Sequence, residues 1–425
     1  MKRSKSIITA LLFLVLISVL FGSSAFCSPV EIQFWDMVWG PKEYIETATK
    51  LVDKFNQENK DFKVIYQSTP WSNWYQTFAT AIASGTAPDI STGGGYQAFQ
   101  FSKLSDAILP IDDVIAELKS SGKAKDYSGN SLEMMKYKGH YYALPWMIDI
   151  RSFWYRKDLF EQAQVQSPKN WSELRKVLKQ LTHGNTFGTI AAGNANQGWH
   201  FLVSMMVNNG GGLFDAKGNV VAKSARNMET YKFLSDLAAD GSINPAGVGF
   251  DNDTAIKSFA AGRTAIYLSG PDLENRLPEL KGKIAVMSPI AGPHGNKGVL
   301  CWNNNIMIYK DSKHPKEAKI FLKWWAENQK VLFTEGHCSG LPIRKSFSED
   351  AYFTQNENVA KILREYVPIG KSTGTMVPGL FPELNEIEGD SLLRNAMQGL
   401  VLKMDYKRIA NNIQTGITEI MKKGN

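Results

Sequence analysis

Closely spaced acidic residues are the first candidates for chemistry in this sequence. Asp112 and Asp113 are adjacent, and Glu386 and Glu388 lie two positions apart, so either pair could supply the two carboxylates of a glycoside hydrolase. Such an enzyme needs a fixed separation of the two carboxyl groups in space, which spacing along the chain does not determine. Adjacent acids more often belong to a solvated surface. We therefore keep a secreted glycoside-active enzyme only as an alternative reading.

Other catalytic and cofactor signatures are missing or out of context. Ser120 and Lys123 have the spacing of a penicillin-binding motif, but they lie in a polar loop without the companion motifs. The sequence contains no nucleophile elbow, zinc-protease motif, phosphate-binding loop or dinucleotide fingerprint in a fitting context. It has no Cys/His spacing typical of a metal site either. The sequence predicts a protein that is not an enzyme, with no cofactor and no metal.

Aromatic and polar residues near predicted strand ends suit a different chemistry. A sugar offers flat C–H faces to aromatic rings and hydroxyl groups to planar donors and acceptors, so a sugar site mixes Trp and Tyr with Asp, Asn and Arg. Tyr96 follows a glycine run at the end of a predicted strand, where α/β folds bind ligands. Asp149 and Arg151 fall on one face of an extended segment. They could contact a ligand or form an ion pair with each other.

The N-terminal segment has the features of a secretory signal. Basic residues at Lys2, Arg3 and Lys5 precede an apolar run over 7–21, and small residues follow over 22–25. We expect a signal peptide over 1–27 and a protein exported to the periplasm or the extracytoplasmic face of the membrane. An uncleaved anchor is the alternative. Lipidation of Cys27 is not expected, because the bulky Phe26 stands before it.

Charge and cysteine content exclude some classes of partner. The formal net charge is +7, and removing the three basic residues of the signal leaves 7 − 3 = +4. No Lys/Arg cluster is dense enough to follow a phosphate backbone, so nucleic acid is not an expected partner. Cys301 and Cys338 are the cysteines beyond the signal. They could form one bridge or remain free.

Strand and helix patterns alternate through the first part of the chain. Extended segments at 31–35, 62–66 and 89–91 are separated by predicted helices, one with Ile45, Ala48, Val52 and Phe55 on one face and one over about 74–84. This order predicts a parallel sheet covered by helices. After the signal, 425 − 27 = 398 residues remain, which exceeds what one core normally serves. Two α/β domains are therefore expected.

The second part of the chain adds two long extended segments and several helices. Residues 141–160 read as extended and then as a helix start, and Pro145 favours a crossing strand over a central one because it has no N–H to donate. A second extended segment is predicted over 299–309. Helices are predicted over 171–182, 314–333, 391–404 and 408–423.

Four stretches together resemble the extracellular solute-binding proteins of the sugar-transport type, relatives of maltose-binding protein. They are the segments 34–36, 83–90, 142–160 and 259–266, which read FWD, ASGTAPDI, YALP followed by WYRKDLF, and FAAGRTAI. Each is weak alone, but their order and spacing are specific, and they span essentially the whole chain after the signal.

The resemblance implies two α/β lobes, each a mixed sheet flanked by helices, joined by extended hinge crossovers. We expect lobe 1 over 28–145 plus about 303–345, and lobe 2 over about 150–298 plus about 349–425. The hinges are expected near 144–150, 298–305 and 343–348. The resemblance further implies a monomer that takes a carbohydrate in the cleft and delivers it to the permease subunits of an ABC importer.

Candidate ligand contacts follow from matching the family's cleft loops to this sequence. The expected contacts are Asp36, Trp39, Trp74, Tyr96, Asp149, Arg151, Trp199, Asp272, Trp302, Asn303 and Phe381. Asp272 stands where maltose-binding protein commonly has a tryptophan, which argues against specificity for maltodextrins. A non-sugar solute such as a polyol phosphate is a second alternative, although only Arg151 is an obvious cation for a phosphate group.

Overall fold

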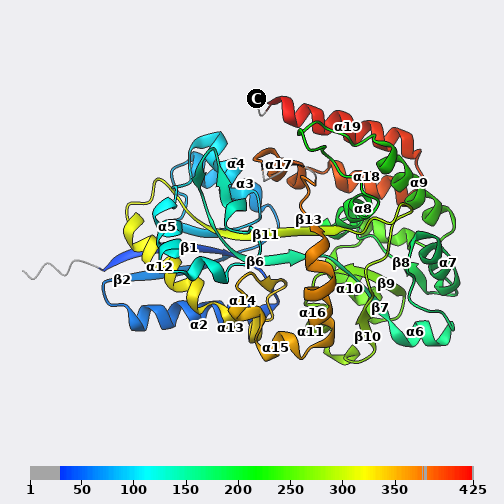
Figure 1. Ribbon diagram of the computed structural model, residues 1–425, viewed down its shortest axis with the longest axis horizontal. Coiled ribbons are helices and arrows are strands. Elements are labelled where there is room, and N and C mark those ends of the chain that lie inside the picture. The colour runs from blue at the N-terminus through cyan, green and yellow to red at the C-terminus, as the bar shows by residue number, and fades with distance from the viewer. Residues whose placement is uncertain (1–28, 376, 378–380, 424–425) are drawn as a thin grey trace, which may run out of the picture.

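The computed structural model describes residues 29–375, 377 and 381–423. The expected signal peptide and Cys27 lie outside the described residues. Two separate main sheets organise the chain, one on the left and one on the right of Figure 1. No helix within the described ranges is both long enough and apolar enough to cross a membrane.

The first sheet has the strand order β12-β6-β11-β3-β1-β2, with the short β13 also paired to β11. Strand β1 runs parallel to β2 and β3, whereas β11 is antiparallel to both β3 and β6. Its members are β1 (Val30–Met37), β2 (Phe62–Thr69), β3 (Ile90–Gly93), β6 (Leu144–Ile150), β11 (Val299–Ile308), β12 (Leu341–Pro342) and β13 (Gly370–Lys371). The sheet is therefore mixed, and the parallel part predicted from the first three strands is present.

Successive side chains of β1 point to opposite faces of this sheet and pack against different helices. Phe34 packs edge-on against Phe321 and Trp325 of α12, at ring-centroid distances of 5.2 and 4.9 Å. Its neighbour Trp35 packs against Phe78 of α3 at 5.5 Å, on the opposite face. The helices around this sheet are α2 (Lys42–Glu58), α3 (Trp74–Ala83), α4 (Gln97–Ser105), α5 (Asp112–Ser120), α12 (Pro315–Asn328) and α13 (Lys330–Thr334).

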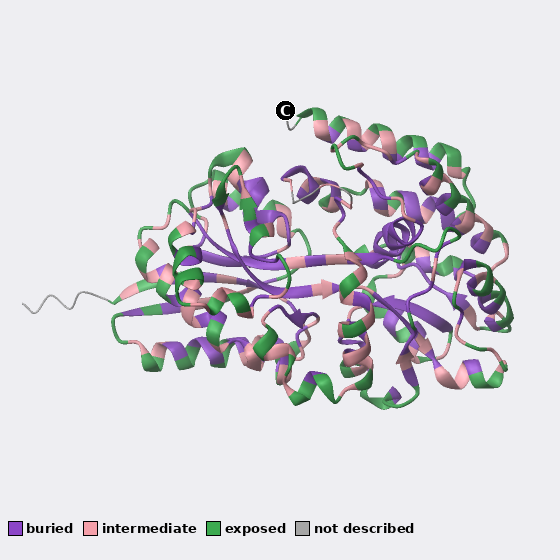
Figure 2. Cartoon of the chain, in the orientation of Figure 1, coloured by how far each residue is buried: buried purple, intermediate pink, exposed green. Residues whose placement is uncertain are grey.

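The second sheet is smaller, with the order β10-β7-β9-β8. Strand β7 is antiparallel to both of its neighbours, and β8 runs parallel to β9. The strands are β7 (Ser152–Arg156), β8 (Phe187–Thr189), β9 (Thr264–Ser269) and β10 (Ile284–Val286). The interior of both sheets is buried, and the exposed residues lie on the outer faces of the helices (Figure 2).

The remaining helices lie mostly, but not all, around this smaller sheet. They are α6 (Lys157–Gln162), α7 (Trp171–Leu181), α8 (Asn196–Asn208), α9 (Ala225–Ala239), α10 (Asn252–Ala260), α11 (Leu273–Arg276), α14 (Lys345–Ser348), α15 (Ala351–Thr354), α16 (Glu357–Lys361), α17 (Glu383–Gly389), α18 (Leu392–Val401) and α19 (Tyr406–Lys423). The remaining short elements are the strands β4 (Lys136–Tyr137) and β5 (His140–Tyr141), the π-helix η5 (Ile362–Tyr366) and the 3₁₀ turns η1 (Lys123–Asp126), η2 (Glu133–Met135), η3 (Pro245–Gly249), η4 (Pro278–Leu280) and η6 (Val367–Ile369).

The chain passes between the two sheets at a single residue after β6. Ile150 ends β6 in the first sheet and Ser152 begins β7 in the second, so Arg151 lies at the passage. Its backbone N–H donates to the carbonyl of Leu300 in β11 at 3.0 Å, which ties the two long strands together at this point. Figure 1 shows β6 and β11 side by side; β6 runs toward the second sheet and β11 runs in the opposite direction.

Two expectations about these elements were wrong. The strand with Pro145 does cross to the second sheet, as expected, but it is not kept from an inner position, because β6 lies between β11 and β12. A bulge absorbs the proline: Asn304 pairs with Met147 and Asn305 with Pro145, which leaves Trp146 without a partner on β11. The helix predicted over 314–333 is broken at Gln329 into α12 and α13.

Candidate functional site

A cavity of about 560 Å³ lies where the two sheets meet. Its walls come from the loops after β1 and β3, the start of α3, strands β6 and β11, the start of α8, the end of β9, and α17. This volume is in the range of small-molecule sites, about 300–1,000 Å³. We call this cavity the cleft.

The structure brings seven of the eleven expected contacts into the lining of the cleft. These are Trp39, Trp74, Asp149, Arg151, Trp199, Asp272 and Trp302. The other four, Asp36, Tyr96, Asn303 and Phe381, do not line it. They lie behind its wall or on the opposite face of a strand.

Asp149 and Arg151 form the ion pair that the sequence left as an alternative to ligand contact. Two guanidinium nitrogens of Arg151 donate to the two carboxylate oxygens of Asp149, and Nη2 lies 3.1 Å from Oδ2. The Nε–H of Arg151 donates to Nδ1 of His200 at 3.0 Å. Burial, and then the nearby Arg151 charge, lower the pKa of His200 well below its usual range. The imidazole is therefore neutral at pH 7, as an acceptor must be.

Trp302 is held on its face and at its edge. The guanidinium of Arg151 stacks over its ring, 4.9 Å from the centroid. Its indole N–H donates to Oε1 of Glu388 in α17 at 2.7 Å, and the hydroxyl of Thr373 donates to the same oxygen. Burial raises the pKa of Glu388 to about 7, and these two hydrogen bonds oppose that rise. The indole is fixed against the cleft floor.

A row of tryptophans forms the wall on the side of the first sheet. Trp39 packs edge-on against Trp71 at 4.8 Å, and Trp71 packs edge-on against Trp74 at 6.0 Å. The indole N–H of Trp39 donates to Oγ1 of Thr92 at 2.9 Å, and that of Trp71 donates to the carbonyl of Val38 at 2.8 Å. Trp71 remains 37% exposed. The polar edges are thus satisfied within the protein, and ring surface remains for a ligand.

Asp36 lies behind this wall and makes all of its hydrogen bonds inside the protein. It is fully buried and accepts from Thr92 at 2.6 Å, Tyr44 at 2.9 Å and Tyr66 at 3.3 Å. Burial raises its pKa to about 7, and the three hydroxyl groups and Trp39 oppose the rise. Through Thr92, which also binds the indole of Trp39, Asp36 positions a wall residue.

Tyr96 and Phe381 also lie outside the lining. The hydroxyl of Tyr96 accepts from the backbone N–H of Thr373 at 3.1 Å, which places Tyr96 behind the Thr373–Glu388 contact. Phe381 packs edge-on against Phe214 at 4.9 Å. Both aromatic residues are therefore occupied by packing in this structure.

The opposite wall carries Trp199 and Asp272. Trp199 lies in the first turn of α8, and its indole N–H donates to Oδ1 of Asn196 at 3.2 Å. Asp272 follows β9 and forms no ion pair with any described residue. Burial raises the pKa of Asp272 to about 6, with Arg276 as the main opposing charge. Asp272 is thus a carboxylate acceptor in the cleft wall.

Several lining residues were not among the expected contacts: Trp71, His200, Asn304, Glu388 and Arg394. Asn304 could have been found from the period of two in a strand, because Trp302 and Asn304 point to the same face. Glu388 was considered only as half of an acidic pair. Nothing in the local sequence indicates that Arg394 lines the cleft, because it lies on a helix far along the chain.

The two cysteines do not form a bridge. Cys301 and Cys338 are both free, and the Sγ of Cys338 lies 3.1 Å from the Sδ of Met147. Burial raises the pKa of Cys301 to about 12, so its thiol is protonated. Among the described residues there is also no group of His, Cys, Asp and Glu that could hold a metal ion.

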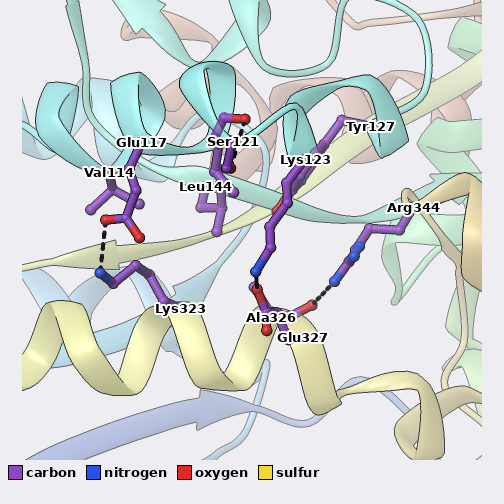
Figure 3. Close-up of a pocket in the computed structure, with 11 residues that line it drawn as sticks. Val114, Glu117, Ser121, Lys123, Tyr127, Leu144, Lys323, Ala326, Glu327 and Arg344 are labelled. Carbon is purple, nitrogen blue, oxygen red and sulfur yellow. Dashed lines mark hydrogen bonds and ion pairs between the residues drawn. The ribbon is translucent and has the colours of Figure 1, made fainter.

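A second, smaller cavity of about 70 Å³ lies beside the first sheet, between α5, η1 and α12 (Figure 3). Ion pairs close its rim. Lys323 bonds Glu117 at 2.9 Å, Lys123 pairs with Glu327, and Arg344 donates to the carbonyl of Ala326 at 3.0 Å. Its charged groups are already paired, and it is too small for a sugar.

Comparisons with known proteins agree with this architecture. The sequence profile described as "Bacterial extracellular solute-binding protein" matches residues 41–331. A sugar transporter from Arthrobacter chlorophenolicus A6, crystallised with bound laminaribiose, is 36% identical. That match covers 92% of this chain and 99% of the other, with a TM-score of 0.86.

More distant relatives are named as binding proteins for oligosaccharides. The arabinooligosaccharide-binding protein of Bacillus subtilis is 24% identical, over 73% of this chain and 74% of its own length. The galactooligosaccharide-binding protein of the same organism is 24% identical, over 85% and 84%. These relatives are named as binding proteins, and the matched family is one of solute-binding proteins, not of enzymes. The chain belongs to the family of bacterial extracellular solute-binding proteins.

Proposed function

We propose that this protein binds a short oligosaccharide outside the cytoplasmic membrane and delivers it intact to the permease subunits of an ABC importer. The observation that carries the proposal is the chemistry of the cleft. Its walls combine exposed tryptophan ring surface with carboxylate, amide and guanidinium groups, which is the combination that a sugar needs. The similar Arthrobacter protein has laminaribiose in its crystal structure, so a β-linked glucose disaccharide is the first ligand to test.

Seven residues are proposed as direct ligand contacts: Trp39, Trp74, Asp149, Arg151, Trp199, Asp272 and Trp302. They come from both halves of the molecule, so a sugar that touches all of them binds a closed arrangement better than an open one. The proposed lobes remain 28–145 with about 303–345, and about 150–298 with about 349–425. The proposed hinges near 144–150 and 298–305 coincide with β6 and with the first part of β11, and the one near 343–348 follows β12.

The protein is proposed to act as an exported monomer, in the periplasm or on the extracytoplasmic face of the membrane. Its family is extracellular, and the basic and apolar start of the sequence is typical of a secretory signal. The energy for transport would come from the ATPase of the importer, a separate chain.

The alternatives are less well supported by the cleft. A polyol phosphate needs several free cations. The guanidinium of Arg151 is occupied by Asp149 and His200, and Arg276 is paired with Asp253, which leaves Arg394 as the one arginine of the cleft lining without an ion pair to a described residue. A glycoside-active enzyme needs a carboxylic acid and a carboxylate on either side of the sugar bond. Glu388 is held by Trp302 and Thr373, which suits a positioning role.

The test is a titration of the mature protein with laminaribiose, maltose, arabino- and galacto-oligosaccharides and glycerol phosphate. Tryptophan fluorescence and thermal melting are followed together. A bound sugar stabilises the folded protein by about 2.7 kcal/mol at a hundredfold excess over its Kd, so the Tm rises. A saturable shift with the sugar recovered intact supports the proposal. Shifts with glycerol phosphate alone, or recovery of a cleaved sugar, would refute it.

A further inference from the structure

Three consecutive asparagines in β11 face different surroundings. In the pairing of β11 with β6, Trp302 lies opposite Asp149, Asn303 opposite Ile148, and Asn304 opposite Met147. Successive residues of a strand point to opposite faces. Asn304 therefore shares the face of Trp302 and Asp149, and all three line the cleft. Asn303 points the other way, with its Nδ2 3.1 Å from the Sδ of Met134.

The amide of Asn304 is the one of the three that has no partner. Asn304 is 3% exposed, and its Nδ2 is buried without a hydrogen-bond acceptor among the described residues. Its Oδ1 accepts no hydrogen bond from them either. In contrast, the Nδ2 of Asn305 donates to the carbonyls of Gly94 and Gly95, at 3.3 and 3.2 Å, although the Oδ1 of Asn305 is also buried without a partner among the described residues. A buried amide without partners costs stability, so its retention beside the cleft calls for a function.

A bulge in β6 separates Asn304 from Asn305. The pairing shifts between Asn304 and Asn305, opposite Pro145 and the unpaired Trp146. Bulges re-aim side chains and are frequent next to functional sites. Beyond the shift, Asn305 is drawn to the Gly94–Gly95 turn, while Asn304 stays on the cleft face with Trp302. The side-chain N–H of Asn305 thus bonds the backbone of a turn, whereas that of Asn304 has no partner among the described residues.

We propose that Asn304 is a specificity-determining residue that binds two adjacent hydroxyl groups of the sugar. Its N–H would donate to one hydroxyl oxygen, and its carbonyl would accept from the next hydroxyl. A half-turn of the amide exchanges its two ends, so either end can face the ligand. The substrate class is then a pyranose with neighbouring free hydroxyls at the floor of the cleft, in contact with Trp302. This inference rests on the proposed carbohydrate-binding function.

The first experiment compares wild type, Asn304→Leu and Asn303→Leu by calorimetric titration, using laminaribiose or whichever sugar of the panel binds wild type best. Leucine keeps the size of the side chain and removes its polar groups. We expect Asn304→Leu to weaken binding about tenfold or more, because the sugar hydroxyls lose their partners. The Tm without sugar should equal or exceed that of wild type. Asn303→Leu, on the face turned away from the cleft, should bind like wild type.

A second experiment uses monodeoxy derivatives of the same sugar. In wild type, the loss of a hydroxyl that contacts Asn304 should weaken binding; in Asn304→Leu, the same loss should have little further effect. A purely structural role would not produce this coupling. The proposal is overturned if Asn304→Leu binds as well as wild type, or if every deoxy sugar loses the same factor in both proteins. If wild type itself binds no sugar, the proposed function fails first, and this assignment fails with it.

Discussion

The cleft and the small cavity of Figure 3 differ in how their polar groups are satisfied. Around the small cavity of Figure 3, each lysine or arginine has a partner: Lys323 with Glu117, Lys123 with Glu327, and Arg344 with Asp126. In the cleft, Asn304 has no partner, and Asp272 and Arg394 form no ion pair with any described residue. Both of these cavities contain charge, but of the two it is the cleft that has unused hydrogen-bonding capacity among the described residues.

This difference separates polar groups that stabilise the fold from polar groups that can bind a ligand. A polar group that is already paired contributes to folding and has little left for a ligand, whereas an unpaired one is costly until a ligand satisfies it. Variants of paired groups should therefore change stability, and variants of unpaired groups should change affinity.

The largest effect is expected for Arg151→Met, because Arg151 is paired with Asp149 and also lines the cleft, so its loss should change both stability and affinity. It is paired with Asp149 and stacks on Trp302, both of which line the cleft. Its removal leaves the Asp149 charge alone in a largely buried position, so we expect a loss of about 2–3 kcal/mol in stability, discounted for partial exposure. Affinity should fall by about a hundredfold or more. Urea unfolding and calorimetry measure the two. If this variant were as stable as wild type, the Asp149–Arg151 pair would not contribute to folding, and the prediction would be wrong.

Asp36→Asn should change the pH dependence of stability and leave affinity unaltered. The pKa of Asp36 is raised from 3.8 to about 7 in the folded protein. The folded state therefore holds this proton more tightly, so the contribution favours folding below pH 3.8 and is lost as the pH rises through 7. Between pH 3.8 and 7, each such group lowers the free energy of unfolding by at most about 1.4 kcal/mol per pH unit.

The measurement is urea unfolding of wild type and Asp36→Asn from pH 4 to pH 8. Asp272 and Glu388 also have raised pKa values, so the wild-type slope has several sources and the variant should lose one share of it. Asp36→Asn should still bind sugar, because Asp36 does not line the cleft and the asparagine carbonyl can still accept from Thr92, which binds the indole of Trp39. A large loss of affinity with unchanged stability would place Asp36 with the recognition groups.

Asp272→Asn should remove a pH dependence of binding. Burial raises the pKa of Asp272 to about 6, and sugar hydroxyls that donate to the carboxylate favour its charged form. Wild-type affinity should therefore rise by about three- to tenfold between pH 5 and pH 7 and then level off. Asp149, Arg151 and Arg276 are the charged groups that act on this carboxyl, and all three line the cleft. Calorimetry in matched buffers measures the slope, and an equal slope in both proteins would assign it to Glu388 instead.

The smallest effect is expected at the small cavity. In Lys323→Met, the lost pair with Glu117 lies at the surface, with side-chain exposures of 36% and 60%. Exposed pairs contribute about 0–1 kcal/mol, so stability should change by less than about 1 kcal/mol and affinity should not change. The same urea and calorimetry measurements apply. A change in sugar affinity here would mean that the two cavities are coupled, which would break the distinction between them.

Local patterns in the sequence predicted most of the fold. Alternating residues at 31–35 and the helical face of Ala48, Val52 and Phe55 correspond to β1 and α2. These signals are readable because a strand repeats every two residues and a helix every 3.6. Pro145 was misread for a related reason. Its missing N–H is a local fact, but the bulge that accommodates it depends on the register with β11.

The sequence by itself therefore determined the α/β alternation, the two long crossing segments and the types of residue that a sugar cleft would need. Only the tertiary structure decided which of them reach the cleft. Asp36 and Trp39 lie three residues apart, yet one is locked behind the wall and the other forms it. Asn303 and Asn304 are identical neighbours that point to opposite faces. Hydrogen-bond partners and strand register come from segments far apart in the chain, and no local pattern contains them.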